Sequence, residues 1–366
     1  MNRAAAKQCS TSSTLSSVHQ IWDDTSIAGE ETVSTTPHDA PTLVFTLSDL
    51  NVETKSTSTQ TVNDQQSNVM MSHTKFMNDD KGIHFYTGLE TYIKFLFVLN
   101  TLGPAAYHLK YLYSGVQMNV VDQFFLVLIK LRRHTTNFEL SRWFFISSKT
   151  VYNIFCTWVR FMSLQWREIS IWPPQELVRF YCPTDFRTKF PTTRVIIDGT
   201  ECPIKKPKLP TAQQSTFSTY KNRNTVKSVI GITPGGLISL ISPAYGGSTS
   251  DRQIVERTAL HLKCDTGDAI MVDKGFNVQD IFAPYNINVN IPTFFRKKNR
   301  MSSKTVLHDR KISSKRVHIE RVIGLGKTYK ILNEPLNSME TMYATDIIFI
   351  CFMLCNFRTG IVSHDA

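Results

Sequence analysis

The feature of this sequence that most constrains its fold is a change of hydrophobic period near Trp172-Pro173-Pro174. Before this point apolar residues recur at helical spacing, and after Pro191 they form the short runs typical of strands. The predicted strands span residues 194–198, 227–233, 237–245, 269–273 and 289–294, and a helix is predicted at 251–262. We therefore expect a helical domain over residues 81–170, a helix-poor connector over 171–192 and an α/β domain over 193–360.

The predicted helical domain contains several amphipathic segments. We expect helices that begin at Thr87 and that span residues 119–133, 137–144 and 148–162. The last two, joined by Phe145-Ile146-Ser147, fit a helix-turn-helix whose final helix would contact DNA through Lys149, Thr150 and Asn153. A plain helical bundle fits the same pattern equally well.

Charge is unevenly distributed along the chain. Residues 1–80 hold four Lys and Arg against ten Asp and Glu, whereas the remainder holds 37 against 20. The first 80 residues also contain 25 Ser and Thr and no sustained apolar period, so we predict a disordered acidic tail. The basic remainder would attract a polyanion, either nucleic acid or an anionic membrane.

A membrane-spanning segment is not expected. The longest uninterrupted apolar run, residues 347–355, is far shorter than the roughly 20 residues that cross a bilayer, and it is predicted to be a buried helix. No apolar targeting segment begins the sequence, so an intracellular protein is expected. The cysteines are odd in number and lack the spacing of a disulfide framework or a structural zinc site, which predicts reduced core thiols.

Three carboxylates stand where a metal-dependent nuclease would need them. Asp198 and Asp273 each end a predicted buried strand, and Glu320 lies on a helix that follows a basic loop between residues 296 and 316. Clustered carboxylates can hold two divalent ions for phosphoryl transfer, and oxygen ligands favour Mg²⁺ or Mn²⁺. Each residue also has a structural interpretation, because an Asp often caps a turn and Glu320 can pair with Arg316 or Arg321 on its own helix.

A long basic stretch lies beside these carboxylates. Residues 202–250 contain no Asp or Glu, and their cations include Lys205, Lys206, Lys208, Lys221, Arg223 and Lys227. With Arg316 and Arg321 they are candidate contacts to a DNA backbone. A merely solvated basic face is the alternative.

Five sequence blocks carry a family resemblance. They are Asp198-Gly-Thr-Glu-Cys-Pro-Ile-Lys-Lys-Pro207, Tyr220-Lys-Asn-Arg-Asn-Thr-Val-Lys227, Gly247-Ser-Thr-Ser-Asp251, Asp273-Lys-Gly-Phe276 and Arg316-Val-His-Ile-Glu-Arg321. In this order and spacing they resemble the nuclease domain of Harbinger-type DDE transposases, the branch often found behind a THAP-type zinc finger. The resemblance covers about residues 115–358, including a helix-turn-helix segment.

The resemblance implies an RNase H-like catalytic core, a mixed five-stranded sheet with flanking helices. It implies that Asp198, Asp273 and Glu320 are catalytic metal ligands and that Asp251 is a fourth acidic position at the metal site. It further implies a nuclear enzyme that cleaves double-stranded DNA and transfers the freed strand with Mg²⁺ or Mn²⁺. Between the two middle aspartates, Asp273 is favoured because it ends a buried strand, whereas the helix dipole alone can stabilise Asp251.

The sequence departs from the family pattern in three places. Phe145 stands where the turn usually has Gly, Gly324-Leu-Gly-Lys327 follows Glu320 where basic residues are usual, and only Cys9 precedes Cys156, too few for an upstream zinc finger. A separate DNA-binding partner protein or a homo-oligomer would therefore be compatible with the sequence. The alternative functions are a domesticated DNA-binding or scaffold protein without cleavage, and a nuclease that acts on RNA.

Overall fold

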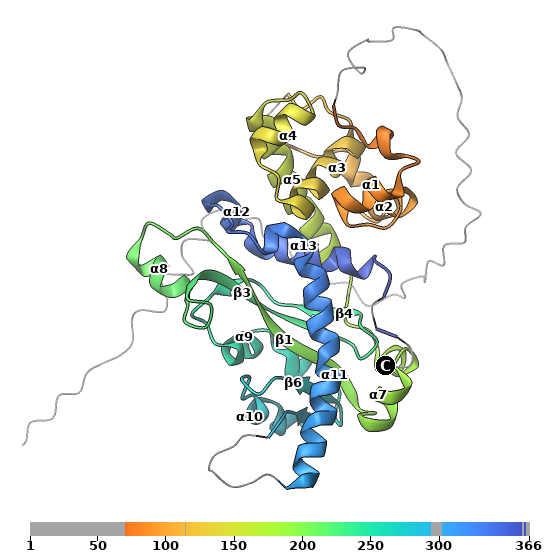
Figure 1. Ribbon diagram of the computed structural model, residues 1–366, viewed down its shortest axis with the longest axis vertical. Coiled ribbons are helices and arrows are strands. Elements are labelled where there is room, and N and C mark those ends of the chain that lie inside the picture. Colours follow the sequence, from red (N-terminus) through yellow and green to blue (C-terminus); the bar gives the residue numbers. More distant parts are fainter. Residues whose placement is uncertain (1–69, 114, 294–301, 361, 364–366) are drawn as a thin grey trace, which may run out of the picture. The chain divides into compact units, whose positions relative to one another are not determined.

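The computed structural model describes residues 70–113, 115–293, 302–360 and 362–363 (Figure 1). The described chain begins with helical elements: η2 (His73–Phe76), α1 (Asp80–Thr87), α2 (Tyr92–Asn100), η3 (Pro104–Tyr107), α3 (Val120–Arg133), α4 (Asn137–Trp143) and α5 (Ser148–Arg167). Most of the predicted acidic tail lies outside the described residues. Its last part, residues 70–80, is folded, because Met71 is buried and the Asp122 carboxylate on α3 accepts hydrogen bonds from Ser72 and the His73 backbone.

The first predicted helix was placed wrongly. Thr87 is the last residue of α1 rather than a cap, and Gly88 follows in the left-handed region with a φ of 83°. The next helix, α2, is capped instead by Thr91, whose side chain accepts a hydrogen bond from the Lys94 backbone. The helix predicted to begin at Thr87 therefore corresponds to α2, which begins at Tyr92.

The helix-turn-helix has the predicted elements. Helices α4 and α5 agree with the predicted spans, although α5 continues to Arg167. Phe145 in the turn has a φ of 52°, a conformation that is strained for a bulky residue, and its side chain is exposed. Capping side chains from Thr136 and Ser147 begin the two helices, which compensates part of this strain.

The predicted helix-poor connector contains two short helices, α6 (Gln175–Phe180) and α7 (Thr184–Lys189). Each follows a proline, Pro174 and Pro183, as is common at helix starts. Phe186 of α7 is fully buried, and neighbouring Asp185 pairs with Lys315. Tertiary contacts of this kind stabilise short helices in a stretch where the prolines had predicted a helix-poor connector.

The sheet is mixed, as predicted, with strand order β2-β3-β1-β6-β7 and with β4 and β5 paired to β3. Its strands are β1 (Thr193–Pro203), β2 (Phe217–Ser218), β3 (Arg223–Ile232), β4 (Ile238–Ile241), β5 (Tyr245–Gly246), β6 (Ala269–Val272) and β7 (Asn288–Asn290). Five of these correspond to the predicted strands, and β2 and β5 add two residues each. The pairs β1–β6 and β6–β7 are parallel, whereas β1–β3 and β3–β4 are antiparallel.

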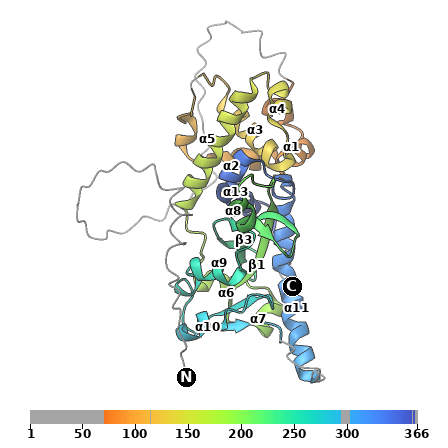
Figure 2. The ribbon, with the colours of Figure 1, turned by 90° about the vertical axis from the view of Figure 1, so that its left-hand side faces the viewer.

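Alternation along the strands divides the buried residues into two cores. Ile196, Ile230 and Met271 belong to a core that also contains residues of α11 (Ser303–Lys327) and of the helical part. Val195, Ile197 and other strand residues belong to a second core with α9 (Asp251–Arg257) and α10 (Gln279–Phe282). Figure 2 shows the sheet between α9 and α11 accordingly.

Helix α11 replaces most of the predicted basic loop. Residues 294–301, which include Arg296 and Lys298, lie outside the described residues, but Lys304 to Arg316 are helical. Ser302 caps the helix by accepting a hydrogen bond from the Thr305 backbone, and Ile312, Ile319 and Val322 are buried against the sheet. Ile312 is buried although it lies within the stretch that the sequence analysis assigned to the basic loop.

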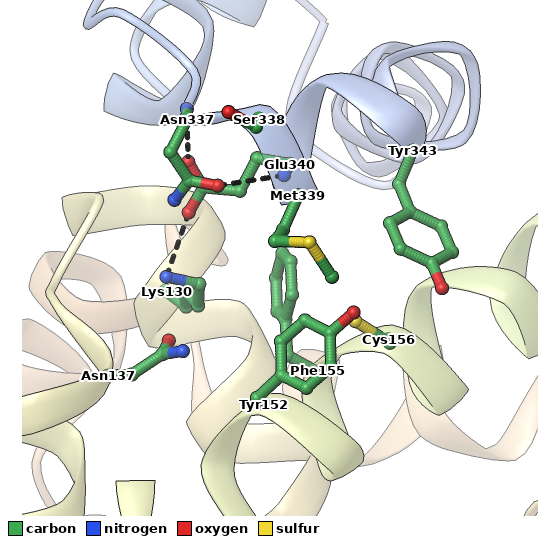
Figure 3. Close-up of a pocket in the computed structure, with 10 residues that line it drawn as sticks. All are labelled: Lys130, Asn137, Tyr152, Phe155, Cys156, Asn337, Ser338, Met339, Glu340 and Tyr343. Carbon is green, nitrogen blue, oxygen red and sulfur yellow. Dashed lines mark hydrogen bonds and ion pairs between the residues drawn. The ribbon is translucent and has the colours of Figure 1, made fainter. Parts of the chain in front are cut away.

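The C-terminal helices join the sheet to the helical part. Helix α13 (Ala344–Asn356) is almost entirely buried, as predicted, and its Asp346 accepts a hydrogen bond of 2.6 Å from Ser163 of α5. Glu340 of α12 (Ser338–Met342) pairs with Lys130 of α3 at 3.0 Å, and both side chains line a cavity of about 300 Å³ (Figure 3). None of the helices described is long and apolar enough to span a membrane. All six cysteines within the described ranges are free thiols, and all but the partly buried Cys264 lie in the core as predicted.

Two glycines of α11 provide a matched test of the packing between α11 and α13. A Cβ on Gly326 would lie 2.5 Å from the ring of buried Phe352, whereas a Cβ on Gly324 would meet nothing within 4 Å. A neighbouring element therefore packs closely against α11 at Gly326 but not at Gly324, and the contact is made by a side chain.

We predict that Gly326→Ala destabilises the protein by about 1–3 kcal/mol, because overpacking outweighs the gain of about 1 kcal/mol in helix propensity. Gly324→Ala should stabilise it by up to about 1 kcal/mol. Urea unfolding followed by circular dichroism measures both changes. Equal effects of the two substitutions would contradict this packing.

Candidate active site

The candidate site lies where β1 extends past the end of β6. Ile197 pairs with Val272, the last residue of β6, so the next residues along the two parallel strands are Asp198 and Asp273. Strand β1 does not end at Asp198, as the sequence suggested, but continues to Pro203 because its other edge stays paired with β3. The two carboxylates are thus neighbours, as expected from two adjacent parallel strands.

Helix α11 brings two further charged groups to Asp273. Strand alternation places Asp198 on the same face as Ile196, toward α11. Arg316 Nη1 lies 2.9 Å from Asp273 Oδ1, and Arg316 Nη2 lies 3.9 Å from Glu320 Oε1. Arg316 is thus a counter-ion between the second and third predicted carboxylates, and its side chain is only 12% exposed.

Asp251 approaches from the opposite face of β1. A Cβ on Gly199 would lie 2.8 Å from Asp251 Oδ1, so the absence of a side chain at position 199 makes room for this carboxylate. Lys227 Nζ lies 3.6 Å from both Asp251 Oδ1 and Glu201 Oε1. Gly247, which precedes Asp251 in its sequence block, is approached by the Thr225 hydroxyl group and the Thr216 carbonyl rather than by the carboxylates.

The burial of these acids raises their proton affinity. Burial is the largest cause that raises the pKa of Asp198 to about 6, and repulsion from Asp273 and Asp251 adds to it. A hydrogen bond from the Gly199 backbone and the charge of Arg316 act in the opposite direction. Burial likewise raises the pKa of Asp251, against the influence of Lys227. Such perturbed acids in a cleft are typical of functional sites.

All four predicted carboxylates line one cleft of about 800 Å³. Basic and aromatic side chains complete its walls, and the lining residues used below are Glu201, Tyr220, Lys221, Arg223, Lys227, Arg316 and Lys327. A cleft of this size, with acids at its centre and cations around them, can accommodate a phosphodiester chain.

The predicted DNA contacts in the nuclease domain have different environments. Lys221 and Arg223 are exposed in the cleft, and Lys227 is half-buried there with its carboxylate partners. Lys205, Lys206 and Arg321 are exposed outside the cleft lining. The guanidinium of Arg316 is engaged by Asp273 in this conformation, and its predicted contact with DNA stays a prediction.

The three residues of α5 that were predicted to contact DNA all have partners within the protein. Asn153 is buried, and its amide group exchanges hydrogen bonds with the backbone of Tyr113, so it does not face DNA. Thr150 is hydrogen bonded to the capping Ser147, and the exposed Lys149 lies over the Tyr113 ring at 4.5 Å. The segment around Tyr113 therefore covers the start of α5, a long-range contact that sequence spacing does not reveal.

Three residues of the cleft were missed by the sequence analysis. Glu201 accepts a hydrogen bond from Thr225 and pairs with Lys227, while Lys327 donates to the backbone carbonyls of Glu201 and Leu332. Tyr220 is 83% exposed. Glu201 and Tyr220 lie within the sequence blocks that carry the family resemblance, and this position could have marked them as candidates. Their place in the cleft, however, depends on the register of β1 with β3.

The donor set suits a hard divalent cation only in part. Four carboxylates that share one cleft offer oxygen ligands, and repulsion from Asp273 and Asp251 adds to the burial that raises the pKa of Asp198. Within the described ranges, however, no three His, Cys, Asp or Glu side chains converge closely enough to hold a metal ion. Arg316 stands between Asp273 and Glu320 instead, so ion binding requires this side chain to move.

The helix-turn-helix, the mixed sheet and its flanking helices define an α/β protein with an RNase H-like core. Residues 197–356 match the family model of the DDE superfamily endonuclease, and residues 116–166 match that of the helix-turn-helix of DDE superfamily endonuclease. No curated protein and no solved structure gave a match. The chain thus contains a DDE superfamily endonuclease domain and its helix-turn-helix.

The raised pKa of Asp198 has a consequence for stability without metal. Its folded-state pKa of about 6 lies above the ordinary value of 3.8, so the folded protein holds the proton more tightly and loses stability as the pH rises through this window. We predict that Asp198→Asn stabilises the metal-free protein by about 1–3 kcal/mol at pH 7.5, where the native carboxylate is charged and only partly accessible to water.

At pH 4 the native carboxyl group is largely protonated, and the two proteins should differ little. Urea unfolding in EDTA at both pH values measures the difference. A variant that is less stable than the native protein at pH 7.5 would show that the buried charge is not a cost to the fold.

Proposed function

We propose that this protein is a Harbinger-type DDE endonuclease that acts in the nucleus and cleaves phosphodiester bonds of double-stranded DNA. The single observation that carries the proposal is that Asp198, Asp251, Asp273 and Glu320 all line one cleft that also has basic walls. The family match to a DDE superfamily endonuclease supports it, and the neighbouring helix-turn-helix supports DNA as the substrate.

Asp198, Asp273 and Glu320 are the residues that would hold Mg²⁺ or Mn²⁺, with Asp251 as a supporting ligand. When bound, the ions would activate the attacking oxygen and stabilise the leaving oxygen. Lys221 and Arg223, which line the same cleft, would bind phosphates of the DNA backbone. Lys227 offsets the charge of Asp251 and thereby favours its ionised form at neutral pH.

A second candidate function is DNA binding or scaffolding without cleavage. The observation in its favour is Arg316, whose guanidinium occupies the space between Asp273 and Glu320. A protein that had lost metal binding could retain this ion pair permanently. The two functions differ in whether Mg²⁺ or Mn²⁺ supports turnover, so a cleavage assay separates them.

We expect Asp198→Asn, Asp273→Asn and Glu320→Gln each to abolish Mg²⁺-dependent cleavage of the DNA that flanks the protein's own gene, because each removes a ligand charge. The affinity for DNA, measured by gel shift in EDTA, should change by less than about threefold, because the contacts to the phosphates are retained. Asp265→Asn, at an exposed position outside the cleft, is the matched control and should cleave normally.

Asp251→Asn should also impair cleavage, with part of the loss recovered at higher metal concentration, because Asp251 lies across Gly199 from the other carboxylates. If Asp273→Asn were fully active and Asp251→Asn inactive, Asp251 would be the essential ligand and Asp273 the supporting one. Absence of cleavage by the native protein with either ion, despite DNA binding, would favour the scaffold function.

DNA affinity should fall steeply with salt. We predict that the slope of log affinity against log salt concentration decreases in magnitude by about 1 for each of Lys221→Gln and Arg223→Gln, since each removes one phosphate contact. Lys263→Gln, at an exposed position outside the cleft lining, should leave the slope unchanged. Fluorescence anisotropy with a labelled duplex measures the slopes. If both cleft variants gave the slope of the native protein, the DNA would bind outside the cleft.

A further inference from the structure

Tyr220 occupies the turn between β2 and β3 at the rim of the cleft. Its side chain is 83% exposed, yet it lines the same cleft as the carboxylates. Exposed apolar residues scattered singly over a surface need no explanation. Tyr220 differs from such scattered residues because its exposed ring lines a cleft together with the charged side chains of Lys221 and Arg223, where a ligand with both a planar face and a negative charge would fit.

The turn that carries Tyr220 is anchored on both sides. The backbone of Lys221 donates to Ser218 Oγ at 3.2 Å, and Asn222 adopts a positive φ of 49° that Asn tolerates well. Buried Asn224 then donates to Thr216 Oγ1 at 2.8 Å and to the Gln213 carbonyl at 2.9 Å. The ring is therefore presented on a fixed support rather than on a loose loop.

The charges around Tyr220 match a nucleotide. Lys221 Nζ lies 4.6 Å from the ring centroid, and exposed Arg223 begins β3 beside it. These cations suit a phosphate, and the ring offers a surface on which a base can stack. Because Tyr220 remains 83% exposed, Lys221 leaves most of the ring free for such a base.

We propose that Tyr220 stacks on an unpaired base of the DNA strand that enters the cleft, next to the phosphate to be cleaved. This inference rests on the proposed DNA endonuclease function. Bases inside a duplex already stack on both faces, so the ring selects a base at an end, a nick or a flipped position. Tyr220 is thus a positioning residue that distinguishes frayed or distorted DNA from continuous duplex.

The experiment uses the full chain in EDTA and two DNA probes of one sequence, a blunt duplex and a duplex with a short single-stranded extension. The extension carries 2-aminopurine, whose fluorescence falls when it stacks on an aromatic ring. The variants are Tyr220→Ala, Tyr220→Phe and the matched control Phe180→Ala, at a ring that is 72% exposed outside the cleft lining.

We expect Tyr220→Ala to bind the extended probe about 5- to 100-fold more weakly and to lose the fluorescence quenching, with blunt-duplex affinity changed less than about twofold. Tyr220→Phe and Phe180→Ala should behave as the native protein does. Retained quenching and affinity in Tyr220→Ala, while the native protein binds and cleaves DNA, would overturn the stacking role alone. Equal losses in Tyr220→Phe and Tyr220→Ala would also overturn it, since the hydroxyl group would then be the contact. Failure of the native protein to bind either probe would remove the proposed function and this inference together.

Discussion

The parallel pairing of β1 with β6 brings Asp198 and Asp273 side by side, and much of the surrounding structure offsets the electrostatic cost of that arrangement. A buried carboxylate is poorly solvated, and a second one beside it repels it, which is why the pKa of Asp198 rises to about 6. Arg316 lies against Asp273, and Lys227 lies between Asp251 and Glu201. Each cation comes from a different element, so the site depends on the register of β3 and the rotation of α11.

Helix α11 links this site to the helical part of the protein. It carries Arg316 and Glu320, and further along Gly326 packs against Phe352 of α13. Helix α13 in turn contacts α5 through Asp346 and Ser163. Between α12 and α3, Glu340 receives contacts from Lys130 and His134. Although burial alone would raise the pKa of Glu340, these cations and hydrogen bonds lower it to about 2, so the link stays charged over the physiological range.

The sequence was sufficient for features that depend on local pattern. Hydrophobic runs placed β1, β6 and α13, and the position of Asp273 directly after a buried strand correctly implied that it would lie beside Asp198. Features that depend on contacts between residues far apart in the chain could not be predicted from the sequence. Asn153 has the polarity of a DNA contact but is buried against Tyr113, and Ile312 is buried although it lies within the predicted basic loop. No spacing rule indicates such tertiary contacts.

The central claim is that the carboxylates of this cleft form a divalent metal site once Arg316 moves away. Diffraction from crystals soaked in Mn²⁺, with anomalous scattering recorded near the manganese edge, tests it most directly. The account predicts an anomalous peak in contact with Asp198 and Asp273, with the Arg316 guanidinium displaced from Asp273. An absence of any peak at these carboxylates at saturating Mn²⁺, with the Arg316–Asp273 pair intact, would contradict it.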